Sequence, residues 1–312
     1  MAVLLETLES LFPLYFFILA GALLGKTKII PKSIEQPLNR IVFVVFISVS
    51  LFVSVYNTNL AEAIDLKAIL FSVVCVLVLA GVGVIVAAKK IPSRPVASVV
   101  AQCAYRTNFG LLGIIYGTLL FGADKIGPAS ILIAVVVPLF NILSVIIFEM
   151  MKGTKPNVGS ILLSVLKNPI VIAVSFAMFF QLTRVPLPDI LYRPLEQISE
   201  AAKPLSLIVA GSSLTFLGLK ANKLWISIAT TVRLLIVPIL LVPLAILFGF
   251  RDITLISLLV AFGGPVATPL PAMAFELGGD GELAAQIVAV TSFVSLFTLH
   301  IFIVVLRSFG FW

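Results

Sequence analysis

Long apolar stretches separated by short polar segments occupy almost the whole sequence. A helix that crosses a bilayer needs about 20 mostly apolar residues, and the segments between these stretches contain turn-forming prolines, as at 89–92 and 183–186. The seventh stretch is the least regular, because Glu196, Glu200 and Lys203 lie near its start. The pattern predicts an all-α membrane protein with ten spans, at residues 8–25, 38–55, 66–88, 96–121, 129–148, 158–181, 198–219, 224–250, 253–276 and 283–306.

The two halves of the sequence repeat one pattern. Matched residues recur 157 positions apart, since 194 minus 37 and 251 minus 94 both equal 157. The matched pairs include Pro37 and Pro194, Arg94 and Arg251, Asn108 and Pro265, Gly122 and Gly279, and Asn141 and Thr298. Five spans per half is an odd number, so the second half enters the membrane from the opposite side. We predict an inverted repeat of residues 1–150 and 151–312; chance similarity between two Leu- and Val-rich stretches is the alternative.

The fourth and ninth spans contain residues that interrupt a helix. A proline removes a helical hydrogen bond and clashes with the preceding turn, and the ninth span contains Gly-Gly-Pro at 263–265 followed by two more prolines. The fourth span has a softer break around Thr107 and Asn108. Unsatisfied backbone groups are costly in lipid, so both breaks are predicted to be buried or to line a cavity. The predicted helix-breaking residues are Gly110, Gly113, Gly264, Pro265 and Pro269.

Two half-helices that begin near the middle of the membrane would favour an anion. Their N-termini carry free N–H groups and positive partial charge, and paired interruptions in two halves are the best sequence indication of a transporter's binding site. The alternative is a pair of structural kinks without a ligand. The predicted substrate-binding residues are Asn108, Arg106, Gly110, Pro265, Thr268, Asn141 and Ser50.

Several polar residues inside spans allow more than one interpretation. A charge inside a span is costly and is taken as functional by default, so Arg106 would either hold a carboxylate or cap freed carbonyls or pair with an acid such as Glu276. Asn108 offers donors and an acceptor and is the first choice for substrate contact. Asn141 would face the cavity or hydrogen-bond another helix. For Arg233 we favour a side chain that reaches to the membrane interface.

Composition limits the class of protein. The chain has 312 residues, of which 61% are hydrophobic and 11% charged, a balance typical of a polytopic membrane protein. Cys75 and Cys103 both lie in apolar runs, so neither a disulfide framework nor a metal-ligand spacing is present, and we expect no metal, no cofactor and no nucleic-acid partner. Paired acids, a metal cluster and an activated nucleophile are also missing from the sequence, so we do not expect an enzyme.

Basic residues predict the orientation. The odd-numbered loops contain ten Lys and Arg residues, and the termini with the even-numbered loops contain six. We expect the protein to lie in the cell membrane. Because Lys and Arg prefer the cytoplasmic side, both termini are predicted to be extracellular. The net charge of +7 is explained by this asymmetry.

Several short motifs, by their order and spacing together, resemble the auxin efflux carrier family of membrane transporters over most of the chain. The segments that carry the resemblance are RTNFGLLG at 106–113, FG at 121–122, LKNP at 166–169, AAKPLSL at 201–207, GSSL at 211–214, RLLIVP at 233–238, and residues 265–295. The resemblance implies a ten-helix inverted repeat with crossed, broken helices four and nine. It also implies a scaffold domain of helices 1, 2, 6 and 7, a mobile transport domain of helices 3–5 and 8–10, an elevator motion, a homodimer and a carboxylate-bearing substrate. Asn108 matches the asparagine that the family places at the substrate.

This sequence departs from the family pattern at three places. The fourth span lacks the crossover proline, Lys203 replaces a small residue before Pro204, and the loop at 152–160 is short, so auxin itself is not implied. We hypothesise a secondary transporter of a small organic anion. The alternatives are a carrier coupled to Na⁺ or H⁺, similar to the bile-acid/sodium carriers, and a membrane sensor that does not transport. No Asp or Glu lies clearly at the centre of a span, so proton coupling has no direct support, whereas broken-helix carbonyls and hydroxyls would suit Na⁺.

Overall fold

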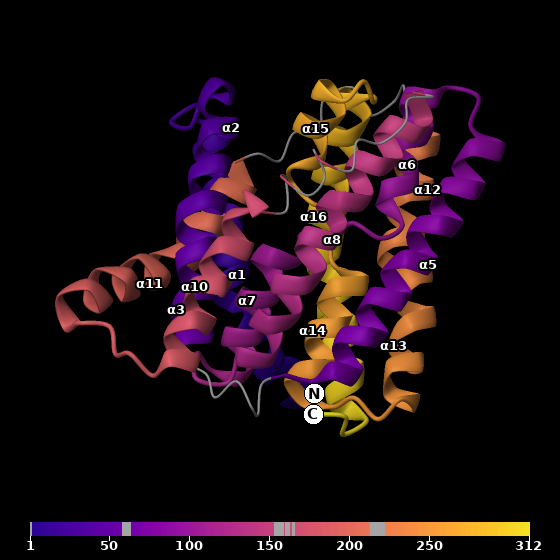
Figure 1. Ribbon diagram of the computed structural model, residues 1–312. Coiled ribbons are helices and arrows are strands. Elements are labelled where there is room, and N and C mark those ends of the chain that lie inside the picture. The colour runs from indigo at the N-terminus through magenta and orange to yellow at the C-terminus, as the bar shows by residue number, and fades with distance from the viewer. Residues whose placement is uncertain (1, 58–63, 153–158, 160–162, 164–165, 213–221) are drawn as a thin grey trace.

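The computed structural model describes residues 2–57, 64–152, 159, 163, 166–212 and 222–312 (Figure 1). Within these residues the regular elements are all helices, and the one β-type pairing is an isolated antiparallel bridge between Thr107 and Val266. The first half contains α1 (Ala2–Lys26), α2 (Lys32–Ile41), the π-helix η1 (Val42–Ile47), α3 (Ser48–Tyr56), α5 (Leu66–Lys90), α6 (Arg94–Cys103), α7 (Phe109–Phe121) and α8 (Gly127–Lys152). The second half contains α10 (Pro169–Thr183), α11 (Asp189–Ser212), α12 (Lys223–Thr231), the π-helix η2 (Val232–Ile236), α13 (Val237–Leu247), α14 (Asp252–Gly263), α15 (Leu270–Glu276) and α16 (Gly281–Ser308).

Five of these helical stretches are long and apolar enough to cross a membrane: Ser33–Tyr56, Leu66–Lys90, Gly127–Lys152, Lys223–Leu247 and Gly281–Ser308. Shorter apolar helices accompany them at Leu11–Lys26, Phe109–Phe121, Pro169–Thr183 and Asp252–Gly263. Every predicted span overlaps helical residues. The seventh begins earlier than predicted, because α11 starts at Asp189 and its first turns include Arg193 and Glu196.

The fourth and ninth predicted spans are both interrupted. Helix α6 ends at Cys103 and α7 begins at Phe109, while α14 ends at Gly263 and α15 begins at Leu270. In the second interruption the cause is local, because prolines at 265, 269 and 271 cannot supply helical hydrogen bonds. The first interruption has no proline or glycine between the two helices, so its cause is pairing with the second.

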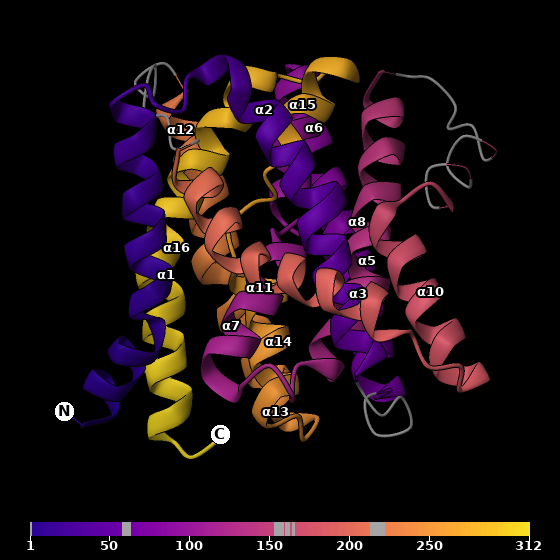
Figure 2. The same cartoon turned by 90° about the vertical axis from the view of Figure 1, so that its left-hand side faces the viewer.

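Two groups of helices are visible in Figure 1. Helices α1, α2, α3, α10 and α11 lie at the left, and α5, α6, α8 and α12–α16 lie at the right. Figure 2 shows α11 running obliquely over the middle of the molecule, from beside α3 toward α1, with both chain ends at one end of the molecule. The α1–α11 crossing is very close, because a Cβ added to Gly21 would overlap the carbonyl oxygen of Ile208 and one added to Gly211 would overlap that of Ile18. Small residues permit such close approach of membrane helices.

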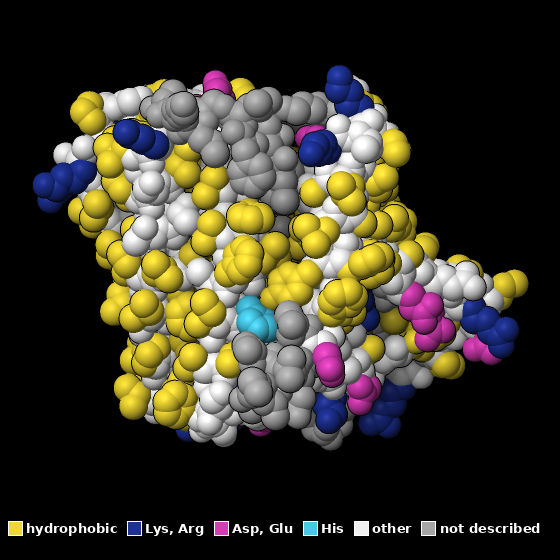
Figure 3. Space-filling model, turned by 180° about the vertical axis from the view of Figure 1, so that it is seen from behind, with side chains coloured by type: hydrophobic (Ala, Val, Ile, Leu, Met, Phe, Trp, Pro, Cys, Tyr) yellow, Lys and Arg dark blue, Asp and Glu magenta, His cyan; other side chains and the backbone are white. Residues whose placement is uncertain are grey.

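The outer surface has the pattern expected in a bilayer. Figure 3 shows hydrophobic side chains across the middle of one face, with Lys, Arg, Asp and Glu gathered toward the two ends and on the projecting part. On helix α5, for example, more than half of the residue surface is exposed at each of Leu70, Val74, Val78 and Val82. Apolar exposure of this extent indicates contact with lipid. The protein is therefore a multi-pass membrane protein, in agreement with its composition.

Candidate functional site

The two interrupted segments cross each other inside the molecule. At the crossing, the backbone N–H of Asn108 donates to the Pro265 carbonyl at 2.9 Å, and the backbone N–H of Ala267 donates to the Arg106 carbonyl at 3.4 Å. These two bonds lie on either side of the Thr107–Val266 bridge. The Val266 amide donates to the Thr291 hydroxyl at 3.2 Å. Backbone groups that the interruptions leave without helical partners are thus satisfied by each other and by α16, as burial in an apolar environment requires.

Arg233 binds the C-terminal ends of the helices that lead into the crossing. Its Nε donates to the Gly264 carbonyl at 2.9 Å, one terminal nitrogen donates to Ala104 at 3.0 Å, and the other donates to Ala261 at 2.7 Å. The side chain is 0% exposed. The expectation that Arg233 reaches to the membrane interface is therefore wrong. Three carbonyls at the ends of α6 and α14 accept the hydrogen bonds that water would accept at the interface.

Arg106 is also buried, at 1% exposure, but it binds side chains and not carbonyls. Its terminal nitrogens donate to Asn141 Oδ1 at 2.9 Å, to the Ser144 hydroxyl and to Met273 Sδ at 3.1 Å. Its Nε has no partner among the described residues. The capping role that the sequence left open for Arg106 thus belongs to Arg233, and the other alternative, a pair with Glu276, concerns a side chain outside the described part of the structure.

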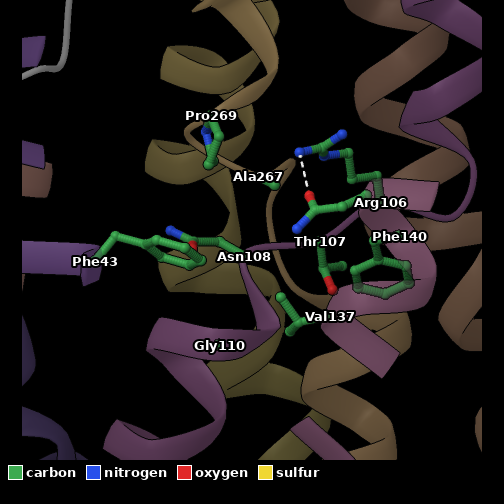
Figure 4. A pocket seen from close by; sticks show the side chains of 10 residues that line it. Phe43, Arg106, Thr107, Asn108, Gly110, Val137, Phe140, Ala267 and Pro269 are labelled. Carbon is green, nitrogen blue, oxygen red and sulfur yellow. Dashed lines mark hydrogen bonds between the residues drawn. The ribbon is translucent and has the colours of Figure 1, made fainter. Parts of the chain in front are cut away.

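A small cavity lies beside the crossing (Figure 4). Its volume is about 30 Å³, which is enough for about two water molecules. Contributions come from η1, the α6–α7 interruption, α8 and the α14–α15 interruption. The lining residues are Phe43, Arg106, Thr107, Asn108, Gly110, Val137, Phe140, Asn141, Ala267 and Pro269.

The cavity has an electropositive character. Asn108 is the N-cap residue of α7, but its side chain does not accept a hydrogen bond from the first N–H groups of that helix. The Asn108 side chain itself has no hydrogen-bond partner within the described residues. The Arg106 guanidinium adds a full positive charge, and no acidic residue is among the described residues that line the cavity. A small anionic group with several acceptor oxygens fits these donors.

The structure brings several predicted site residues together and leaves others apart. Asn108, Arg106, Gly110 and Asn141 line the cavity, as does Pro269, which stands at the N-cap of α15. Pro265 and Gly264 form the crossing through their carbonyls. Thr268 lies between two lining residues but is not itself one of them. Ser50 lies away from the cavity, where its hydroxyl accepts from Ser199 of α11 at 3.2 Å. Gly110 and Gly113 lie inside α7, and the interruption precedes them.

Gly113 serves packing. A Cβ at this position would lie 2.8 Å from the Phe109 ring and 2.9 Å from Ile133 Cδ1, which shows how closely α7 approaches α8 there. This glycine is among the predicted helix-breaking residues of the fourth span, three positions after Gly110. The same spacing places both glycines on one face of a helix, which is the arrangement that the structure contains.

Other residues of the site were not predicted. Ser144 lies three positions after Asn141, so both side chains share one face of α8, and this spacing was a usable signal. Arg233 is a charge inside an apolar stretch, which marks a functional or structural role in membrane proteins. Phe43 and Thr291 gave no signal, because each lies in an apolar helix whose partner depends on the fold.

Comparison with known protein families identifies the family of this chain. The model of a family described as membrane transport protein matches residues 6–303. No curated protein matches. The family match covers nearly the whole chain and confirms the resemblance to the auxin efflux carrier family.

Proposed function

The chain belongs to the membrane transport protein family, and from this premise we propose that it carries a small organic anion with a carboxylate group across the cytoplasmic membrane. The observation that carries the proposal is the cavity between the start of α7 and the buried Arg106. A helix N-terminus favours an anion. Arg106 adds a positive charge and an Nε–H that has no partner among the described residues, and the Asn108 side-chain amide makes no cap to α7.

We further propose ten spans arranged as a five-plus-five inverted repeat. The support is that the two interruptions fall at matching places in the halves and that both chain ends lie at one end of the molecule, as an even number of spans requires (Figures 1 and 2). In this proposal both ends lie outside the cell, which the excess of Lys and Arg in the odd-numbered loops supports.

An elevator motion is the proposed mechanism. Helices α1, α2–α3, α10 and α11 would form the scaffold, and α5–α8 with α12–α16 would form the moving body. Phe43 of η1 belongs to the first group, whereas the other residues around the cavity belong to the second. The cavity thus lies at the boundary of the two groups, where sliding of one against the other would expose it to each side in turn. Pairing of two scaffolds would give a homodimer.

The test is a thermal-shift screen of the purified protein against acetate, lactate, benzoate, malate and citrate. A ligand that binds the folded state raises its apparent stability. Reconstituted vesicles then show whether the acid that binds also moves across the membrane. Stabilisation without flux would indicate a sensor, and no stabilisation by any acid in the panel would contradict the proposed substrate class.

Asn108→Ala examines the site itself. Loss of one buried hydrogen bond to the acid costs about 1–3 kcal/mol, which corresponds to about a 5- to 150-fold weaker Kd. The matched control is Asn57→Ala, because Asn57 is an exposed residue that binds Tyr192 far from the cavity. Wild-type affinity in Asn108→Ala, or an equal loss in both variants, would refute the assignment.

A further inference from the structure

Arg233 takes the place that other carriers with broken helices give to a metal cation. In such carriers, unwound carbonyls and the C-terminal ends of half-helices coordinate Na⁺. Here the freed carbonyls at the ends of α6 and α14 belong to Ala104, Ala261 and Gly264, and all three accept hydrogen bonds from one guanidinium. The Ala261 carbonyl also accepts from the Thr107 hydroxyl at 3.1 Å.

The helix that carries Arg233 is shaped for this contact. Residues Val232–Ile236 form a π-helix, and α13 continues with Pro238 near its start. Wider turns of this kind are frequent at functional sites in helices. The sequence places Val76 at the matching position of the first half, 157 residues earlier (233 minus 157). One arginine from the second half therefore serves the interruptions of both halves.

The helix ends that meet at the crossing differ in partial charge. The C-terminal ends of α6 and α14 carry negative partial charge, and Arg233 neutralises it with a full positive charge that is attached to the protein. The N-terminal end of α7, whose partial charge is positive, faces the cavity and has no such counter-charge among the described lining residues.

We propose that Arg233 is a built-in counter-cation, a positioning residue that holds the crossing in its anion-binding geometry so that no sodium ion is needed there. This inference rests on the proposed function for its anion, but the position of Arg233 at the carbonyls does not depend on which substrate is carried. It selects, among the coupling modes that the sequence left open, a carrier whose crossing is complete without Na⁺.

Chemical rescue tests the proposal on the full chain in detergent. Arg233→Ala leaves the buried carbonyls of Ala104 and Gly264 without a donor, and that of Ala261 with the Thr107 hydroxyl alone. Its unfolding midpoint should therefore fall by about 5 °C or more. Millimolar guanidinium chloride should restore at least half of that loss, because the free ion can enter the space and bind the same carbonyls. Choline chloride at equal ionic strength should restore none.

Arg251→Ala is the matched control. Arg251 also donates to two backbone carbonyls, those of Ile246 and Phe250, but it is exposed and lies outside the crossing. Its midpoint should stay close to that of the wild type and should not respond to guanidinium. Equal midpoints in Arg233→Ala and Arg251→Ala, or a loss that guanidinium and choline affect alike, would overturn the proposal.

Two further measurements keep the proposal testable if Arg233→Ala does not fold. Arg233→Lys keeps the charge but lacks the planar fork, so its midpoint should fall below that of Arg251→Lys; equal midpoints would contradict the role. The wild-type protein should have the same unfolding midpoint in sodium chloride and in choline chloride. A higher midpoint in sodium chloride would show that the crossing still binds a cation.

Anion binding separates this inference from the proposed function. If benzoate, for example, binds the wild type, its affinity should fall in Arg233→Ala and recover with guanidinium. Rescue of stability without any anion binding in the wild type would support Arg233 and refute the proposed function. Intact benzoate binding in Arg233→Ala without guanidinium would refute the positioning role alone.

Discussion

Replacement of Arg106 by methionine removes the charge at the cavity while keeping a long, flexible side chain. In the folded protein the Arg106 Nε has no partner among the described residues, and the other nitrogens bind Asn141, Ser144 and Met273. We expect Nε to donate to the bound carboxylate. A hydrogen bond to a charged group contributes about 1.5–3 kcal/mol, so Arg106→Met should weaken the Kd for the acid about 10- to 150-fold.

The same substitution has a separate effect on folding. Asn141 Oδ1 loses its donor, which costs about 1–3 kcal/mol for a buried acceptor, whereas the Ser144 hydroxyl keeps its bond to the Phe140 carbonyl at 2.7 Å. The double variant Arg106→Met with Asn141→Leu removes both partners and should recover most of the stability, since apolar replacement of a whole pair is nearly neutral. It should not recover anion binding.

Equilibrium binding of a radiolabelled acid to protein in nanodiscs measures the first effect, and the unfolding midpoint measures the second. Arg251→Met is the control, because Arg251 is exposed and distant from the cavity. An Arg106→Met protein that binds the acid within about twofold of the wild type, a difference of about 0.4 kcal/mol, would refute the role of Arg106. Recovery of binding in the double variant would do the same.

Three further tests, two of them with a control substitution, examine the packing and the boundaries of the site. Gly21→Ala should lower the unfolding midpoint because its Cβ meets the Ile208 carbonyl, while Gly81→Ala, which has nothing within 4 Å, should not; equal midpoints would contradict the α1–α11 contact. Thr291→Val removes the acceptor of the Val266 backbone N–H and should lower the free energy of unfolding by about 1–3 kcal/mol. Thr298→Val removes a hydroxyl without a partner among the described residues and should lower it little. A larger loss in Thr298→Val than in Thr291→Val would contradict the crossing geometry. Ser50→Ala should leave anion affinity unchanged because Ser50 binds Ser199 away from the cavity, and a large loss of affinity would return Ser50 to the site.

The sequence predicts the interruptions more reliably than their bounds. Gly-Gly-Pro at 263–265 forbids a regular helix by local chemistry alone, and the structure interrupts the helix there. The break in the first half was expected around Thr107 and Asn108 with Gly110 and Gly113; it lies at 104–108, so it includes Thr107 and Asn108 but neither glycine. Pairing with residues 265–267 decides its place, and such pairing depends on the fold and not on the local sequence.

Buried charges show a second limit of sequence interpretation. Arg106 and Arg233 look alike in the sequence, since each lies inside an apolar stretch. One binds side chains at a cavity and the other binds carbonyls at helix ends. The difference depends on which way each helix faces its neighbours, and the π-helix at η2 affects this for Arg233. A sequence pattern indicates that such a charge needs partners, but only the packed structure identifies them.

An experimental structure of the protein with its bound acid would test the central claim most directly. The account predicts the carboxylate in the cavity between the Arg106 guanidinium and the first turn of α7, with Asn108 in contact and both helices interrupted at the crossing. An acid bound elsewhere, or a continuous helix through residues 94–121 or 252–276, would contradict it.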